Sequence, residues 1–198
     1  MVENVFYYWI LWGAWIIAAF FLKKSIRRTM ISAIILICIA SGEMFIEVSS
    51  FSLRVSFILA LCIGYYLASV CNRKVYHFFS VMTLTSAYAG IHLFEIFDPV
   101  WFIVDRFFVI ISVISILAIY LGKSMPERIG LLVLSMSQGE LLFWVILGKF
   151  HDGLTIGTAD YLNMAAIGCF IVYAWTYLEQ IMASFNQQAQ KSARGKQA

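Results

Sequence analysis

Charged residues are scarce in this sequence, and so is proline. Only 13% of the 198 residues are charged, 62% are hydrophobic, and the mean hydropathy is +0.86. Soluble domains contain about 25% charged and about 45–50% apolar residues. A water-soluble fold of this length could not bury so much apolar surface, so the composition predicts that lipid surrounds most of the chain. The two prolines, Pro99 and Pro126, stand between apolar runs, where proline interrupts no helix.

Paired cysteines and catalytic motifs are absent as well. The four cysteines, none of them in CxxC spacing, lie in apolar runs or at their ends: Cys38, Cys62, Cys71 and Cys169. We interpret them as apolar packing residues and expect no disulfide framework, no metal site and no cofactor. The sequence also has no nucleotide fingerprint, zinc-protease helix or nucleophile elbow, so it does not indicate an enzyme.

The first apolar run, Val5–Leu22, lacks the marks of a cleaved signal peptide. A signal peptide carries positive charge before its apolar run and a small-residue cleavage site after it. Here Glu3 precedes the run, and the positive charge comes after it at Lys23, Lys24, Arg27 and Arg28. We therefore predict a retained spanning helix whose basic end lies in the cytoplasm.

Seven apolar runs approach the length of about 20 residues that a helix needs to cross the hydrocarbon core. They are Val5–Leu22, Met30–Ile46, Leu53–Val70, Val75–Phe97, Val100–Leu121, Ile129–Lys149 and Tyr161–Ile181. The second is short and carries Glu43 and Glu47 near its far end, so a re-entrant or tilted segment and a total of six spans stay open. The predicted fold is an all-α polytopic transmembrane bundle over residues 1–182, with a polar, basic cytoplasmic tail over 183–198.

Basic residues predict the orientation, because Lys and Arg favour the cytoplasmic side of short loops. With the N-terminus outside, eleven of the fourteen Lys and Arg residues are inside, and the other three are Arg54, Arg106 and Lys149. The alternation holds at every loop, which also supports the second span. It predicts a multi-pass plasma-membrane protein with a cytoplasmic C-terminus, whose tail frays or lies on the anionic leaflet. Since topology accounts for the basic residues, we expect no nucleic-acid binding.

A polar stripe runs along the fourth predicted helix. At about 100° per residue, five side chains share a sector of about 80° that extends over about 27 Å: His77, Thr85, Tyr88, His92 and Glu95. Polar groups facing lipid are costly, so the stripe should face protein or a water-filled cavity. Three interpretations stay open: an interior face that hydrogen-bonds neighbouring helices, a proton or solute pathway, and a metal site on His92 and Glu95.

Glu140 is the one acidic residue deep in a predicted span, near the expected bilayer midplane. An ionised carboxylate at that depth is costly unless it is paired. It should therefore be a protonated hydrogen-bond donor to a neighbouring helix, with the stripe as a candidate partner, or a site of ion or proton coupling. Gln138 lies about 200° away around the helix and should point elsewhere.

A third set of polar residues gathers at the outer ends of the predicted helices. Its members are Glu43, Glu47, Arg54, Asp98, Asp105 and Arg106, with Glu95 nearby. Each outer arginine lies within a few residues of carboxylates, which predicts ion pairs that close the outer end of the bundle. A rim that binds an external cation or peptide is the alternative.

These residues carry a resemblance. His92-Leu93-Phe94-Glu95, Asp98-Pro99-Val100-Trp101, Asp105-Arg106 and Gln138-Gly139-Glu140, with the early Tyr7-Tyr8-Trp9, resemble the YphA-like integral membrane proteins of spore-forming bacilli. The similarity covers nearly the whole chain. It implies a small plasma-membrane protein without an established enzymatic activity, linked to spore envelope assembly, and it brings no agreed catalytic or binding residues.

Two main functions are open as hypotheses. The first is a non-enzymatic scaffold or accessory factor in cell or spore envelope assembly, with the bilayer and other membrane or envelope-assembly proteins as partners. The second is a small ion- or proton-coupled transporter or channel that uses Glu140 and the stripe, although no inverted repeat is visible. An intramembrane enzyme built on His92 and Glu95 is a weaker third.

Small residues at four-residue spacing, such as Ala60 and Gly64 or Ser135 and Gly139, predict packing faces within the bundle or between copies of the chain.

Overall fold

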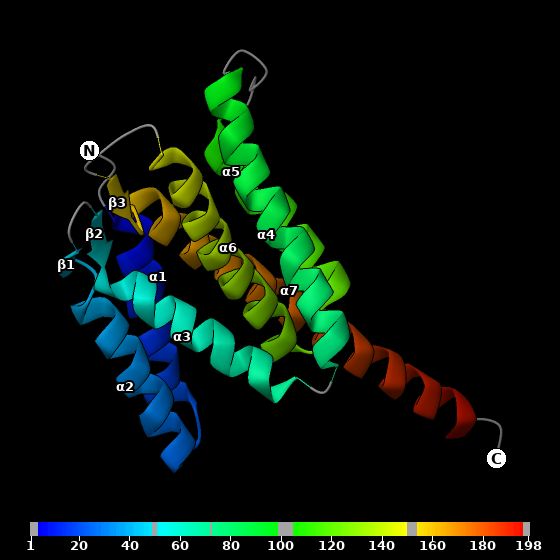
Figure 1. The fold of residues 1–198 in the computed structure, drawn as a ribbon. Coiled ribbons are helices and arrows are strands. Elements are labelled where there is room, and N and C mark those ends of the chain that lie inside the picture. Colours follow the sequence, from blue (N-terminus) through cyan, green and yellow to red (C-terminus); the bar gives the residue numbers. More distant parts are fainter. Residues whose placement is uncertain (1–3, 49–50, 72, 99–104, 150–153, 196–198) are drawn as a thin grey trace.

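The computed structural model describes residues 4–48, 51–71, 73–98, 105–149 and 154–195, with the side chains of Val48, Leu154 and 187–195 left aside. Helices dominate this part of the chain (Figure 1). In chain order the elements are α1 (Val5–Ile16), the π-helix η1 (Ile17–Phe21), α2 (Ile26–Ala40), β1 (Phe45–Val48), β2 (Phe51–Arg54), α3 (Val55–Val70), α4 (Lys74–Phe97), α5 (Arg106–Leu121), α6 (Met125–Leu147), β3 (Leu154–Ile156) and α7 (Ala159–Gly195).

Helix α6 is the centre of the bundle. It packs chiefly against α4 and α3, and also against α7, while α5 lies on α7 and α4 and the α1–α2 pair joins through α7. Small residues allow the closest contacts. A Cβ atom at Gly64 of α3 would lie 3.0 Å from the Cα atom of Leu134, so this glycine lets α3 approach the backbone of α6. Gly90 has nothing within 4 Å and forms no such contact.

A small sheet lies at the end of the bundle that holds the N-terminus, and the C-terminus lies at the opposite end (Figure 1). Strands β1 and β2 pair antiparallel, with Phe45 opposite Arg54, and β2 pairs parallel with β3, with Ser52 opposite Thr155. Two predicted helix ends were therefore wrong. The end of Met30–Ile46 lies in β1, and the beginning of Leu53–Val70 lies in β2. These residues are rich in β-branched and aromatic side chains, which suit a strand when a partner strand is available.

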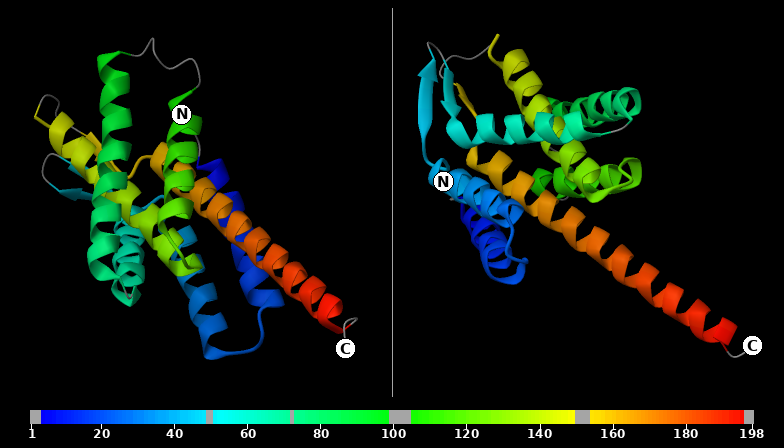
Figure 2. Two further views of the ribbon diagram at one scale, coloured as in Figure 1. Left: turned by 90° about the vertical axis from the view of Figure 1, so that its right-hand side faces the viewer. Right: turned by 90° about the horizontal axis from the view of Figure 1, so that it is seen from below.

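Several helix ends also differ from the predicted ones. Helix α5 begins at Arg106, where the Asp105 carboxylate accepts the Phe107 N–H at 2.9 Å. Helix α6 begins at Met125, before the predicted start, because Ser124 and Glu127 form a capping box. The polar tail does not fray at residue 183: α7 continues through Gly195 and projects from the bundle (Figure 2). Residues 99–104, which include Pro99 and Trp101, lie outside the described residues.

The surface of the bundle is strongly apolar. Phe21, Phe97 and Tyr120 each expose 80% or more of their surface, and many other large apolar side chains are exposed beside them. Exposed apolar side chains in this number are typical of a surface that contacts lipid or another protein. Two helices, Met125–Leu147 and Ala159–Asn186, are long and apolar enough to cross a membrane, while Val5–Phe21, Val55–Val70 and Arg106–Leu121 are apolar but shorter. The count of seven spans stays a prediction.

Candidate functional site

Glu140 lies between α4, α6 and the start of α7. Only 2% of its surface is exposed. It is the sixteenth of the 23 residues of α6, so it lies past the middle of the helix toward the end that carries the sheet. The capping box starts α6 four residues before the predicted start, which moves the centre of the helix away from Glu140; the position of Glu140 near the bilayer midplane stays a prediction.

Within the described part of the chain, the polar groups that contact the Glu140 carboxylate are donors. The Tyr88 hydroxyl of α4 donates to Oε2 at 2.8 Å, and the Trp144 indole, one turn along α6, donates to Oε1 at 2.9 Å. The backbone N–H groups of Gly157 and Thr158 also face this carboxylate, just before α7 begins. The N-terminus of a helix favours negative charge, so α7 adds to the effect of the four donors.

This set of partners suits an ionised carboxylate, which accepts hydrogen bonds and donates none. A protonated carboxyl would need one of its neighbours to accept, and among the four only the Tyr88 hydroxyl can do so. With the Tyr88 hydroxyl as donor, Glu140 is the common acceptor of three segments, while the expectation of a protonated Glu140 that donates to a neighbouring helix stays a prediction. Charge-assisted hydrogen bonds of this kind are about twice as strong as neutral ones.

Gly139 brings Tyr88 to this carboxylate. A Cβ atom at position 139 would lie 2.6 Å from Cδ1 of Tyr88, so a larger residue would push the tyrosine ring away from α6. Gln138 also contacts α4: its Oε1 lies 3.4 Å from the Thr85 hydroxyl, and its amide donates to the Tyr65 hydroxyl of α3 at 2.8 Å. Gln138 therefore has other partners than Glu140, although one of them, Thr85, belongs to the stripe. All three residues of Gln138-Gly139-Glu140 thus hold α4 against α6.

The fourth-helix stripe is divided rather than continuous. Tyr88, Thr85 and His92 face α6, and the His92 ring contacts Tyr88 and Phe143 with centroid distances of 4.6 and 5.0 Å. His77 lies near the opposite end of α4, and the buried Val81 and Leu84 lie between it and Thr85. Nε2 of His92 is buried without a hydrogen-bond partner among the described residues.

Glu95, the last residue of the stripe, pairs with Arg106. The distance between Arg106 Nη1 and Glu95 Oε2 is 2.7 Å, and Arg106 Nη2 lies 3.1 Å from Asp160 Oδ2. One arginine therefore joins α4, α5 and α7. Glu95 is engaged in this ion pair, and the metal site on His92 and Glu95 that the sequence left open stays a hypothesis. The partner Asp160 was not predicted, since it lies 54 residues away in the sequence.

The other outer residues form a separate group at α1, α2 and the sheet. The Arg54 guanidinium donates to the Gly42 carbonyl at 2.9 Å and lies 4.6 Å from the centre of the Phe45 ring. Glu43 accepts a hydrogen bond from Asn4 at 2.7 Å. The predicted ion pair of Arg54 was therefore wrong within the described residues, because the strand turns its side chain toward a backbone carbonyl and a ring.

Three more residues of the predicted outer cluster have local positions. Glu47 is exposed on β1 opposite Ser52, and Asp105 caps α5. Asp98 comes directly after α4, where its N–H donates to the Phe94 carbonyl. The predicted cluster is thus two groups, one at Arg106 and one at Arg54.

The opposite end of the bundle holds polar contacts that the sequence did not indicate. Arg128 of α6 is buried; it donates to the Gly122 carbonyl and the Thr176 hydroxyl, and its Nη1 pairs with Glu179 of α7. In the charge count Arg128 was one basic loop residue among eleven. The Ser124-x-x-Glu127 pattern could have placed it in the first turn of α6, where its side chain faces the next helix.

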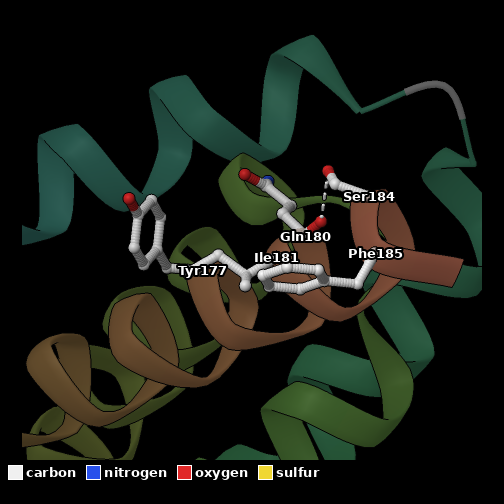
Figure 3. Close-up of a pocket in the computed structure, with 5 residues that line it drawn as sticks. All are labelled: Tyr177, Gln180, Ile181, Ser184 and Phe185. Carbon is white, nitrogen blue, oxygen red and sulfur yellow. Dashed lines mark hydrogen bonds between the residues drawn. The ribbon is translucent and has the colours of Figure 1, made fainter. Parts of the chain in front are cut away.

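A surface groove of about 310 Å³ lies on α7 near this end, about five turns beyond the start of α7 that faces Glu140. Its lining residues all come from α7: Tyr177, Gln180, Ile181, Ser184 and Phe185 (Figure 3). Ser184 donates to the Gln180 carbonyl within the helix. A groove on a single helix face with no buried ionisable group offers no enclosed binding site.

Comparison with known proteins agrees with the architecture. The model of the YphA-like integral membrane protein family matches residues 3–198. The Bacillus subtilis protein described as "Uncharacterized protein YphA" is 27% identical over 195 residues, which cover 98% of each chain. No solved structure matches. The resemblance drawn from the sequence is confirmed: the chain belongs to the YphA-like integral membrane protein family.

Proposed function

We propose that this protein is a non-catalytic, multi-pass factor of the plasma membrane that scaffolds or assists cell or spore envelope assembly. The observation that carries the proposal is the enclosure of Glu140. Its carboxylate is 2% exposed and is surrounded by donors from α4, α6 and the turn before α7. Such a group joins helices and fixes their packing, as buried polar networks do when their members are satisfied.

A small ion- or proton-coupled transporter is the second candidate. Two features favour it: Glu140 is ionisable, and the nearby His92 has a buried Nε2 without a partner among the described residues. Against it, a transported ion would have to displace donors that already fill the carboxylate. The polar stripe is also interrupted by Val81 and Leu84, so these side chains do not form a continuous relay along α4.

The proposed partners are other membrane or envelope-assembly proteins, or a second copy of the chain, together with the surrounding lipid. The support is the apolar exterior. Phe20, Phe78 and Phe79 each expose 60% or more of their surface. Lipid or a partner helix can cover such side chains.

The proposed function is tested by complementing a strain that lacks the gene with Glu140→Gln. Glutamine cannot ionise, so ion coupling predicts loss of function even when the variant reaches the normal amount of folded protein in the membrane. The scaffold proposal predicts that function depends on the folded amount and returns when stronger expression matches the wild-type level. Loss of function at a matched folded level would sink the scaffold proposal in favour of ion coupling.

The proposed topology has seven spans, with the N-terminus outside, and it predicts which surface positions react with an impermeant thiol reagent. In a background without the native cysteines, Glu47→Cys on β1 should label in intact cells. Arg27→Cys and Lys123→Cys should label only after permeabilisation. All three positions are exposed in the structure, so access depends on the side of the membrane.

The reverse labelling pattern would overturn the orientation. Protection of both Glu47→Cys and Arg27→Cys would show that the segment between them does not cross the membrane, which would leave six spans. Permeabilised cells provide the control that each cysteine is reactive.

A further inference from the structure

Three potential metal ligands meet at the end of the bundle opposite the sheet. Cys71 comes directly after α3, His77 lies in the first turns of α4, and Glu127 lies in the first turn of α6. One ligand atom from each, the cysteine sulfur, an imidazole nitrogen and a carboxylate oxygen, lies within 4.8 Å of the other two. Cys71 and His77 are buried, with 8% and 4% of their surface exposed. Within the described residues this is the one such group of three.

The capping box positions the carboxylate. Glu127 Oε2 accepts the backbone N–H groups of Lys123 and Ser124 at 2.9 and 3.3 Å. This leaves Oε1 directed at Cys71, whose sulfur lies 2.8 Å away as a donor. One carboxylate oxygen therefore fixes the helix start, and the other is free to bind a cation in place of the thiol proton.

His77 supplies the independent sign of a missing ligand. Its Nε2 is buried and has no hydrogen-bond partner among the described residues. A buried polar atom without a partner costs free energy, so natural structures seldom leave one. A neutral imidazole nitrogen is also a common metal ligand. Packing alone explains the burial of this ring, but it does not explain why one of its nitrogens is left unpaired while the ring lies beside a thiol and a carboxylate.

We propose that Cys71, His77 and Glu127 bind a divalent transition metal of the zinc class, with the fourth position open to water or another ligand. Thiolate, imidazole and carboxylate are the ligand types of zinc, at about 2.0–2.3 Å from the ion. In a tetrahedral site these ligand atoms lie about 3.5 Å apart. Small side-chain rotations would therefore bring the three ligand atoms, which now lie up to 4.8 Å apart, to this spacing.

The surroundings fit such a site. The backbone N–H of Arg73 faces the Cys71 sulfur, and hydrogen bonds of this kind orient metal ligands and stabilise a thiolate. Binding displaces the thiol proton of Cys71 to solvent, as metal binding to a cysteine requires. In the proposed topology this end of the bundle is cytoplasmic, where cysteines stay reduced. The ion would tie α3, α4 and α6 together at their connections.

Cobalt is the probe, because Co²⁺ takes zinc sites and reports a bound thiolate through a charge-transfer band in the near ultraviolet. The purified full-length protein is stripped with a chelator and titrated with Co²⁺, then with Zn²⁺ as competitor. We expect one Co²⁺ per chain, the thiolate band, and displacement by Zn²⁺. The same result is expected for Cys62→Ser and His92→Gln, which change an exposed cysteine of α3 and the other buried histidine of α4.

Variants of the three ligands should behave differently. Cys71→Ser should lose the charge-transfer band. His77→Gln should weaken metal binding by more than about tenfold, because loss of even a residue that only supports a ligand weakens binding by about that much. Glu127→Gln is the decisive variant if Cys71→Ser fails to fold, because glutamine keeps the capping box. It should keep the wild-type melting temperature without metal and lose the rise that Zn²⁺ gives the wild type.

An absent thiolate band in the wild type would overturn the proposal. So would a band that persists in Cys71→Ser or disappears in Cys62→Ser, or a Zn²⁺-dependent rise in melting temperature that is unchanged in Glu127→Gln. These outcomes do not depend on the scaffold proposal, since they concern binding and not envelope assembly.

Discussion

Replacing Glu140 with alanine should cause the largest loss of folded protein among single substitutions in the bundle. The change removes the common acceptor of the Tyr88 hydroxyl, the Trp144 indole and the N–H groups of Gly157 and Thr158. Each buried donor left without a partner costs about 1–3 kcal/mol. The sum is comparable with the whole stability of a typical domain, about 5–15 kcal/mol.

The measurement is the folded yield in detergent by size-exclusion chromatography, together with the melting temperature. Gln138→Ala is the matched control, because it lies two residues away on α6 but loses only a hydrogen bond to the more exposed Tyr65 and a long one from Thr85. Equal yields for Glu140→Ala and Gln138→Ala would show that the carboxylate does not hold the three segments together.

Glu140→Gln tests which protonation form the packing requires. Glutamine keeps the size and one acceptor oxygen, but its NH₂ group needs an acceptor, and among the four neighbours only the Tyr88 hydroxyl can accept. We therefore expect a clear loss of stability, smaller than that of Glu140→Ala. The protonated form, one of the two interpretations that the sequence left open, predicts a nearly silent change instead. A melting temperature equal to that of the wild type would support the neutral form and contradict the ionised one.

The second large effect should come from the pair of Arg128 and Glu179, and it should be asymmetric. Arg128 is buried, whereas the Glu179 side chain is 48% exposed. Glu179→Ala leaves a buried guanidinium without its anion, and breaking a buried pair in this way costs about 3–5 kcal/mol. The lower part of that range applies here, since solvent reaches Glu179. Arg128→Ala should cost less, because the remaining carboxylate can be hydrated.

The double variant Arg128→Met with Glu179→Ala should recover much of the loss, since an apolar side chain of similar length fills the site without a charge. Melting temperatures of the three variants are the measurement, and Lys123→Ala, at an exposed neighbouring position, is the control. If Glu179→Ala were milder than Arg128→Ala, the guanidinium would be hydrated and the buried pair would not stabilise this end of the bundle.

Composition and local periodicity were enough to predict the class of the protein and the faces of its helices. Low charge and high hydropathy indicated a helical membrane protein, and the motifs around His92 and Glu140 indicated its family. The angular spacing of Thr85, Tyr88 and His92 placed them on one face of α4, and the structure has them facing α6. Such predictions succeed because helix geometry depends only on neighbouring residues.

The tertiary structure decided which groups meet across helices. It paired Arg106 with Asp160, surrounded Glu140 with donors from three segments, formed the sheet from strands that lie about a hundred residues apart, and brought Cys71, His77 and Glu127 together. Periodicity predicts which residues share a face of a helix. It does not predict which helix packs against that face, how far the two helices are shifted along their axes, or which connecting segment contacts them. Those depend on how whole helices pack, where small residues such as Gly64 and Gly139 allow close approach and larger ones prevent it.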